Sequence, residues 1–372
     1  MAVTSLRALL NPAVDRRASY RGLFDEAEYR AVTDFFERRP HLSPTPLRAL
    51  PRLAARLALG HILIKDETQR FGLESFKIAG ARYAMETLGA AKLAPGVVCA
   101  TAGNHGRAVA RAAHDLHVPC TVFVPAAHQR ATPLELRTRQ ARIEGMRQDG
   151  AHTIDVGGSY EDAIERAVDH ARRTGANVIS DTAWEADDAV PRLIMAGYTR
   201  LFDEASRDWK RAPDVVLVQG GVGGLVCAAA NWFARRDGPR RPFLIACEPE
   251  SAACLLESAR LGRPVTLQRN TDGGAPTMMA GLRCAAPSLA AWPSIRTGID
   301  GVVAVPDAIV VEALELLSHP HADDPPIASG PSGACGIGAL LALLSAPELT
   351  AVRKACALDR STHVMAIVTE GP

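Results

Sequence analysis

Short apolar runs alternate with longer segments of helical periodicity from about residue 60 onward, which predicts alternating strands and helices. The clearest helical face carries Ala163, Ile164, Ala167, Val168 and Ala171, with charged residues opposite. The strand-length runs are 62–64, 97–100, 120–124, 153–156, 177–180, 215–218, 243–247 and 364–368. Apolar strands separated by helices of this length are typical of βαβ units in a mainly parallel sheet that is covered on both faces.

The length of the chain, 372 residues, exceeds what one small core needs, so we predict an α/β fold with two lobes. Each lobe is expected to be a mainly parallel sheet covered by helices. Because residues 80–189 contain four of the expected strands, we expect a small α/β domain there. It would be inserted into a discontinuous large domain, 1–79 and 190–372. The first 40 residues predict a peripheral helix.

Composition and charge narrow the class of protein. Hydrophobic residues make up 47% and charged residues 22% of the chain, which is ordinary for a globular protein. A net charge of +1 indicates no nucleic-acid or anionic-membrane partner, and no apolar stretch is long enough to predict a membrane span. The N-terminal residues lack the apolar segment of a secretory signal, so we expect a cytoplasmic protein. Eight cysteines without a Cys-x-x-Cys pair indicate neither a zinc site nor a disulfide framework.

Lys77 is the candidate nucleophile. It follows the expected strand 62–64 and a polar turn, and it stands where the next helix is expected to begin. The positive end of a helix dipole disfavours an ammonium group, and burial does the same. We therefore expect an uncharged amine that can form a Schiff base. A solvated lysine at a helix start is the alternative interpretation.

Three further loops follow expected strands and carry candidate binding groups. Residues 101–106 read Thr-Ala-Gly-Asn-His-Gly, whose glycines let backbone amides face a carboxylate. Asn104 in this loop can donate to a phenolic oxygen, or it can simply cap the helix. Residues 220–224 contain four glycines in five positions, a backbone nest suited to phosphate. Thr369 ends the last expected strand, where its hydroxyl could meet a pyridine nitrogen.

Two other segments suggest rival sites. Gly221 and Gly223, a helix, a strand and then Glu248 resemble a dinucleotide fingerprint with an acidic ribose ligand, but the third glycine is absent. Residues 319–324, His-Pro-His-Ala-Asp-Asp, would offer metal ligands, but the proline prevents the regular spacing that brings two imidazoles together. We predict no metal site there.

Taken together, these loops resemble the pyridoxal-phosphate (PLP) enzymes of the tryptophan-synthase β and threonine-dehydratase fold, also called fold type II. Within that fold they resemble most the diaminopropionate ammonia-lyases. The similarity runs from about residue 40 to residue 371. It is carried by the runs SPTPL (43–47), RFGLESFK (70–77), GNHGR (103–107), DTAWE (181–185), TMMAGL (277–282) and SGPSGA (329–334).

The resemblance implies PLP as the cofactor and a role for each loop. Lys77 would hold the cofactor covalently, exchange it for the substrate amine and move the α-proton. The other cofactor contacts would be Asn104, Gly220, Gly221, Val222, Gly223, Gly224 and Thr369. Asp181 matches a family aspartate near the substrate amine and would assist departure of the β-group, although a loop carboxylate is the plainer interpretation. Substrate contacts are expected at Thr101, Gly103 and His105, with His105 as a hydrogen-bonding residue.

Ala102 departs from the family pattern. Diaminopropionate ammonia-lyases have an aspartate at this position and related racemases a serine, which serves as the second acid or base on the cofactor face opposite the lysine. Alanine transfers no proton, so we expect chemistry on the D-isomer to be lost. The chain also ends sooner than its relatives, at Gly371-Pro372, so we expect a subunit contact or a closing segment to be missing.

The implied activity is α,β-elimination of L-2,3-diaminopropionate to pyruvate and ammonia by a carbon-nitrogen lyase. One alternative is an L-serine or L-threonine dehydratase, or another amino-acid β-eliminase. A second, of another class, is a protein that binds PLP or an amino acid without catalysis. The expected partners are a small amino-acid substrate and a second copy in a homodimer, with no nucleic acid and no membrane.

Overall fold

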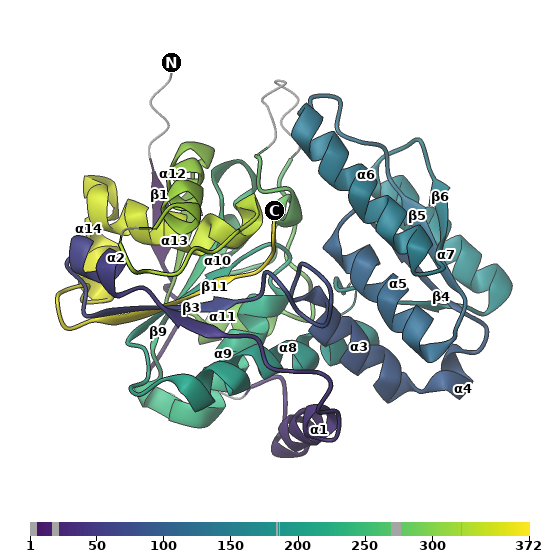
Figure 1. The fold of residues 1–372 in the computed structure, drawn as a ribbon, viewed down its shortest axis with the longest axis horizontal. Helices are drawn as coiled ribbons and strands as arrows, with labels where there is room; N and C mark the ends of the chain where they lie inside the picture. The colour runs from purple at the N-terminus through teal and green to yellow at the C-terminus, as the bar shows by residue number, and fades with distance from the viewer. Residues whose placement is uncertain (1–5, 17–21, 184, 186, 269–276, 321) are drawn as a thin grey trace.

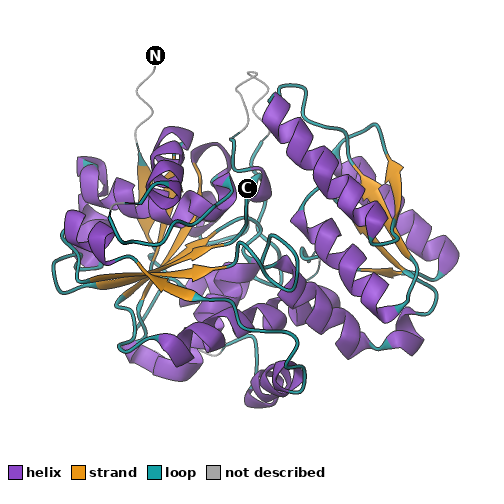
Figure 2. Cartoon of the chain, viewed as in Figure 1, coloured by secondary structure: helices purple, strands orange, loops and turns teal. Residues whose placement is uncertain are grey.

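The computed structural model describes residues 6–16, 22–183, 185, 187–268, 277–320 and 322–372. Two separate sheets lie inside the molecule and helices cover them (Figures 1 and 2). The predicted α/β fold with two mainly parallel sheets is confirmed. A peripheral helix near the N-terminus is also present as α1 (Glu26–Glu37).

The larger sheet has seven strands in the order β1-β10-β9-β8-β11-β3-β2. Its inner strands run parallel, and the edge strands β1 and β2 pair antiparallel with their neighbours. The strands are β1 (Arg7–Leu10), β2 (Leu47–Ala49), β3 (His61–Asp66), β8 (Val215–Gln219), β9 (Phe243–Pro249), β10 (Gly301–Val305) and β11 (His363–Val368).

Helices cover both faces of this sheet because its inner strands are apolar on both sides. In β8, Val216 and Val218 join the core beneath one helical layer, while Val215 and Leu217 join the core beneath the other. The first layer contains α8 (Ala189–Asp208), α9 (Gly224–Asp237), α10 (Cys254–Leu261) and α11 (Trp292–Gly298). The second contains α2 (Pro51–Arg56), α12 (Asp307–Ser318), α13 (Pro331–Ser345) and α14 (Thr350–Ala355).

The smaller sheet is wholly parallel, in the order β6-β5-β4-β7. Its strands are β4 (Val97–Ala100), β5 (Cys120–Val124), β6 (His152–Asp155) and β7 (Asn177–Val178). Helix α7 (Tyr160–Thr174) covers one face, and α5 (Asn104–Leu116) and α6 (Pro133–Gln148) cover the other. The short α4 (Ala90–Leu93) precedes β4.

Each strand predicted from an apolar run coincides with an observed strand to within two residues at either end. The predictions omitted β10, although its composition matches that of the predicted strands. They also omitted β1 and β2, which lie at the sheet edges and are too short and too mixed in polarity to stand out. The domain boundaries at 79/80 and 189/190 stay a prediction.

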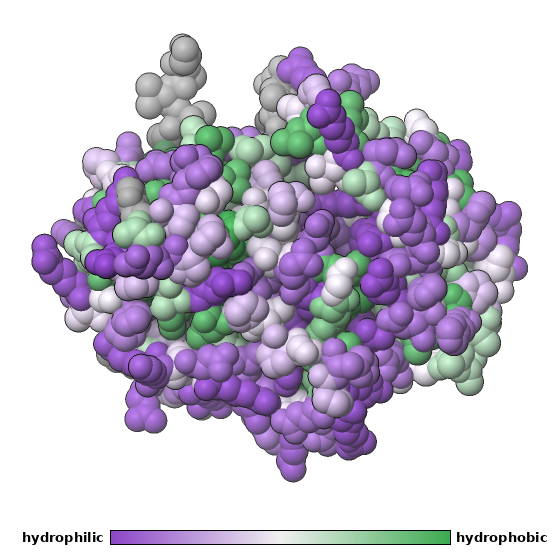
Figure 3. Space-filling model, viewed as in Figure 1, coloured by the Kyte–Doolittle hydropathy of each residue, from purple (hydrophilic) through white to green (hydrophobic). Residues whose placement is uncertain are grey.

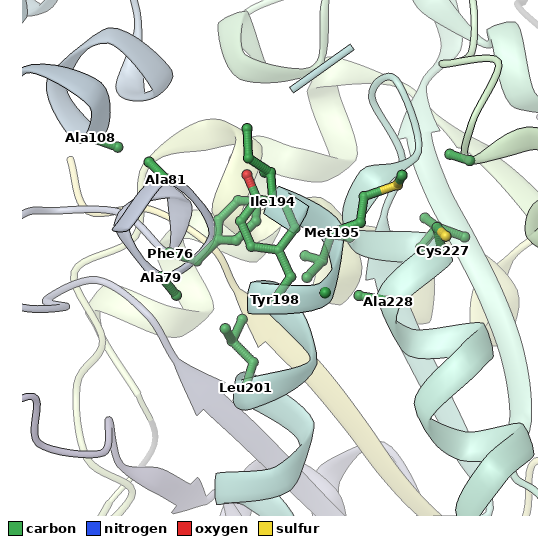
Figure 4. Close-up of a cluster of buried hydrophobic side chains, with 14 of the residues drawn as sticks. Phe76, Ala79, Ala81, Ala108, Ile194, Met195, Tyr198, Leu201, Cys227 and Ala228 are labelled. Carbon is green, nitrogen blue, oxygen red and sulfur yellow. The ribbon is translucent and has the colours of Figure 1, made fainter. Parts of the chain in front are cut away.

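Helix α3 (Lys77–Leu88) packs against both α5 and α8. Its crossing with α8 depends on two glycines. A Cβ on Gly80 would lie 2.7 Å from the Ile194 carbonyl oxygen, and one on Gly197 would lie 2.9 Å from the Ala79 carbonyl oxygen. The two helix backbones therefore touch. Figure 4 shows the buried side chains packed around Ile194 and Tyr198.

Hydrophilic residues predominate on the face shown in Figure 3, and hydrophobic residues form small separate patches there. Among the described residues, no single helix is long and apolar enough to cross a membrane. One bent pair of helices, α13 followed by residues 347–355, is long and apolar enough to span a membrane by length and composition alone. Most of α13 is buried in the core.

Candidate active site

The candidate residues come from the carboxyl ends of strands in both sheets. In the large sheet, Gly220 follows β8 and Thr369 follows β11. In the small sheet, Asn104 begins α5 at the end of the loop that follows β4, and Asp181 lies shortly after β7. Ligands of open parallel sheets bind at this edge of the strands. Contacts between Lys77 and Asp181 and between Asn104 and Glu370 join the two edges, and α3 begins at Lys77 as predicted.

Lys77 and Asp181 form an ion pair across this junction. The Lys77 Nζ lies 2.5 Å from the Asp181 Oδ2, and the two side chains are only 21% and 15% exposed. The Lys77 ammonium also lies 5.2 Å from the ring centre of Phe76 and 5.9 Å from that of Tyr198. The amine is thus held between two aromatic rings and a carboxylate.

The charge of Lys77 differs from the sequence-based expectation. Burial alone would lower the pKa of this amine, as expected, but the Asp181 carboxylate outweighs burial and raises the pKa above its usual value. In the same way burial would raise the pKa of Asp181, but Lys77 and then His105 hold it below its usual range. The prediction of an uncharged amine is therefore wrong for this arrangement, because it omitted the carboxylate that the fold brings to Lys77.

His105 is buried beside this pair. Its Nε2 lies 2.9 Å from the Ile179 carbonyl oxygen, so this nitrogen carries the proton. Its Nδ1 lies 3.9 Å from the Asp181 Oδ2. His105 therefore faces Asp181 from the side opposite its carbonyl partner.

The turn before Lys77 is anchored by a buried ion cluster. The Arg70 guanidinium is fully buried and donates to the carboxylates of Glu67 and Glu204. The Lys65 Nζ also donates to Glu204, at 2.7 Å. A fully buried cation with two paired carboxylates fixes the loop that leads into α3.

The end of β11 joins the same junction. The Phe76 amide donates to the Thr369 carbonyl oxygen at 3.2 Å, which places buried Thr369 against the start of α3. The next residue, Glu370, accepts from the Asn104 Nδ2 at 2.6 Å. The last strand thus touches both Lys77's helix and the Asn104 loop.

The glycine-rich loop is linked to the Asp181 segment through one residue. The Ser288 amide donates to the Val222 carbonyl oxygen at 2.8 Å, and the Ser288 Oγ accepts from the Ala183 amide at 2.9 Å. Gly223 has φ +94°, a conformation that favours glycine, and it caps α9. The first amides of α9 have no partner within the helix, so the loop presents donors suited to an anion.

The two remaining predicted residues shape the Asn104 loop. The Thr101 Oγ1 accepts from the Gly103 amide at 3.0 Å, and Gly103 is the cap residue of α5. The Thr101 hydroxyl therefore holds the loop in shape. This bond was not among the predictions, although a threonine hydroxyl commonly accepts from the amide two residues later in a turn.

Comparisons with known proteins agree with this geometry. Residues 38–358 match the family described as pyridoxal-phosphate dependent enzyme. The diaminopropionate ammonia-lyase of Escherichia coli K12 is 32% identical, with 94% of this chain and 89% of the relative covered.

The chain belongs to the PLP-dependent enzyme family.

Other members extend the comparison. A biosynthetic L-threonine dehydratase of Mycobacterium leprae is 30% identical over 84% of this chain and 67% of its own length. The crystal structure of the Escherichia coli diaminopropionate ammonia-lyase, in complex with an aminoacrylate-PLP azomethine intermediate, has a TM-score of 0.85 at 30% identity. The superposition of the two structures covers 99% of this chain and 94% of the Escherichia coli chain. The predicted family and its cofactor are thereby confirmed.

The residues at the junction fit this family's cofactor. Lys77 supplies an amine for the aldehyde, and the amides at the start of α9 supply donors for a phosphate. A Cβ on Gly221 would lie 3.1 Å from the Cys284 Sγ, so any larger residue would crowd the loop. Burial raises the pKa of Cys284 to about 12, which keeps this neighbouring thiol protonated.

Glu248, which could have been a ribose ligand in a dinucleotide site, instead caps a helix. Its buried carboxyl group accepts from the Leu255 amide at 3.0 Å and the Leu256 amide at 2.7 Å, at the start of α10. It is a helix cap with no free edge for a ribose. The family of the chain also excludes the dinucleotide interpretation.

The histidine-containing run 319–324 is described only in part, because His321 lies outside the described residues. Among the described residues, no group of three or more histidine, cysteine or acidic side chains could hold a metal ion. All eight cysteines are described and free of disulfides.

Glu248 leads to a prediction about stability and pH. Burial raises its pKa to about 8, well above the unfolded value of 4.5. Between these two pH values the folded protein holds a proton that the unfolded chain has lost, so the stability of the fold decreases as pH rises. We expect Glu248→Gln to remove this pH-dependent loss of stability, which is worth up to about 5 kcal/mol.

Urea unfolding of both proteins at several pH values measures the effect. The difference in unfolding free energy, variant minus wild type, should increase from pH 4.5 to 8, while every other titrating group cancels. A difference that is constant over this range would contradict the assignment.

Sequence reasoning missed two residues of the site, Tyr198 and Glu370. Tyr198 lies on α8 and reaches Lys77 only through the α3–α8 crossing, so no local signal marks it. Glu370 did have a local signal, because an acidic residue stands two positions after the end of the apolar strand β11.

Proposed function

We propose that this enzyme eliminates the β-amino group of L-2,3-diaminopropionate, so that substrate and one water give pyruvate and two ammonia molecules. The observation that carries the proposal is the largely buried Lys77–Asp181 pair, which joins an amine to a carboxylate at 2.5 Å. The named relative at 32% identity over 94% of the chain supports the choice of substrate.

The residue roles follow from position. PLP, when bound, withdraws electrons from the substrate Cα and makes the α-proton acidic. Lys77 would hold the cofactor and remove that proton, while Asp181 would hold a proton at the departing amine. Asn104 would contact the cofactor's phenolic oxygen, the loop 220–224 its phosphate, and the Thr369 hydroxyl its pyridine nitrogen.

Substrate contacts are proposed in the loop after β4. The Gly103 amide donates to the Thr101 hydroxyl and so fixes the loop, and the other backbone donors at the start of α5 suit the α-carboxylate. His105 would steer Asp181, since its Nδ1 faces the Asp181 carboxylate at 3.9 Å. Thr101, Gly103 and His105 thus form one side of the proposed substrate site.

A substrate panel tests the proposal and the consequence of Ala102. Pyruvate or keto-acid release is measured from L-diaminopropionate, D-diaminopropionate, L-serine and L-threonine. We expect the L-isomer of diaminopropionate to be turned over at least about 100-fold faster than the D-isomer, because alanine at position 102 supplies no acid or base.

Ala102→Asp is the matched variant. It should raise turnover of the D-isomer by about 100-fold or more, by placing a carboxylate opposite Lys77. Wild-type turnover of the D-isomer at the rate of the L-isomer would contradict this use of Ala102.

The second candidate is a dehydratase of L-serine or L-threonine. It is favoured by Ala102, which suggests a changed substrate, and by the threonine dehydratase that is 30% identical. Faster keto-acid release from a hydroxy amino acid than from L-diaminopropionate would establish it. A protein that turns yellow with PLP but releases no ammonia from any of the four compounds would be a binding protein instead.

We also propose a homodimer in the cytoplasm, with a small domain over residues 80–189 and a large domain formed by the rest. The separate sheets support the two domains. Eight free cysteines are what a reducing compartment favours. Light scattering of the purified enzyme measures the assembly.

A further inference from the structure

Glu370 connects the large sheet to two helices of the smaller one. Its Oε1 accepts from the Ser332 amide at 3.1 Å, near the start of α13. Its Oε2 accepts from the Asn104 Nδ2 at 2.6 Å and pairs with the Arg142 Nη2 of α6 at 3.2 Å. The side chain is buried, with the residue only 5% exposed.

These contacts determine which way the Asn104 amide points. An ionised carboxylate only accepts hydrogen bonds, and each of its oxygens is already engaged with a donor. The Asn104 amide must therefore turn its NH₂ group, and not its oxygen, toward Glu370. One N–H is used by Glu370, and the other remains for a second acceptor.

We infer that Glu370 is a positioning residue, which fixes Asn104 as a hydrogen-bond donor to the cofactor's phenolic oxygen. The inference rests on the proposed role of Asn104. Arg142 supports the arrangement from α6, because its guanidinium pairs with the Glu370 Oε2 at 3.2 Å and holds that oxygen in place. Glu370 follows β11 of the large sheet, whereas Asn104 and Arg142 lie on helices that cover the small sheet. The orientation of Asn104 therefore depends on contact between the two parts of the molecule.

Glutamine at position 370 would reverse the orientation. Its amide has one acceptor, whereas the carboxylate uses two. The Ser332 N–H is held in place by the backbone and would still need an acceptor, so the glutamine oxygen would face Ser332. The NH₂ group of the glutamine would then face Asn104. Asn104 could then satisfy it only by turning its own oxygen toward position 370. A lone pair would face the phenolic oxygen in place of an N–H.

The test is a pH titration of the visible absorbance of the PLP-bound enzyme. A donor to the phenolic oxygen stabilises the deprotonated form of the chromophore, so its loss raises the midpoint. We expect Glu370→Gln to raise the midpoint by roughly 0.5 to 1 unit, and Asn104→Ala to raise it by a similar amount. Loss of a negative charge alone would lower the midpoint, so the sign separates positioning from simple electrostatics.

The double variant gives the decisive comparison. If Glu370 acts through Asn104, Glu370→Gln raises the midpoint in the wild-type background but not in the Asn104→Ala background. An equal change in both backgrounds, or a lowered midpoint in the wild-type background, overturns the inference. If Asn104→Ala leaves the midpoint unchanged, the cofactor role of Asn104 fails, and this inference fails with it.

Two further variants complete the design. Glu370→Asp keeps the charge but withdraws the carboxylate by one methylene, so we expect it to raise the midpoint as well; it also serves if the glutamine variant does not fold. Glu135→Gln is the matched control. This variant weakens a different contact of α6, the ion pair between Glu135 and Arg283. Glutamine can still accept from the backbone amide at the start of α6, so the helix cap is kept. We expect no shift. Because this readout needs only bound PLP, a lack of lyase activity would refute the proposed function without affecting this result.

Discussion

Replacing Lys77 by alanine is expected to lower pyruvate release from L-diaminopropionate by at least about 1000-fold. The variant loses both the amine that would hold the cofactor and the base that would take the α-proton. Position 77 is the first of α3, where alanine is well tolerated, but the substitution also leaves the Asp181 carboxylate without its partner, so thermal unfolding is measured on the same variant. Steady-state pyruvate release measures the loss.

Borohydride reduction provides the second readout for Lys77. Wild-type enzyme treated with PLP and borohydride should carry a stable adduct on the peptide that contains Lys77, and the variant should carry none there. Lys92→Ala is the matched control, because Lys92 is exposed on α4, distant in role from the site. An adduct on a different lysine, with activity retained in Lys77→Ala, would refute the assigned role.

Asp181→Asn should lower elimination by about 100- to 10,000-fold while leaving the borohydride adduct on Lys77 in place. Asparagine keeps the shape of the side chain but carries no exchangeable acid for the departing amine. Because the neutral amide also leaves the ammonium of Lys77 without its charge partner, we expect a lower pKa for that amine.

Stability has to be measured alongside, since breaking a mostly buried ion pair can cost about 3 kcal/mol or more. Thermal unfolding of the PLP-bound variant separates lost catalysis from lost fold. Asp187→Asn, an exposed position in the same segment, is the control and should change neither rate nor stability. Full activity in Asp181→Asn would leave Asp181 as a purely structural partner of Lys77.

Much of the fold could be predicted from the sequence because it depends on local patterns. Apolar strands such as 215–218 are buried on both faces, so their composition alone indicates a covered parallel sheet. The start of α3 at Lys77 was predictable for the same reason. The edge strands β1 and β2 were not, since half of an edge strand faces solvent.

The charge state of the site could not be predicted, because it is set by contacts between residues distant in the chain. Lys77 and Asp181 are separated by 104 positions. Their mutual effect on pKa exists only after both sheets have formed. Glu370 shows the same limit, since nothing near it in sequence indicates that Asn104 and Arg142 lie against it.

The contact between Gly80 and Gly197 has a mechanical consequence. With the backbones of α3 and α8 touching, sliding one helix past the other would require a steric collision, so the two helices must move together as one rigid body. Lys77 at the start of α3 and Tyr198 on α8 therefore keep their relative positions, and the aromatic wall beside the amine is part of the scaffold.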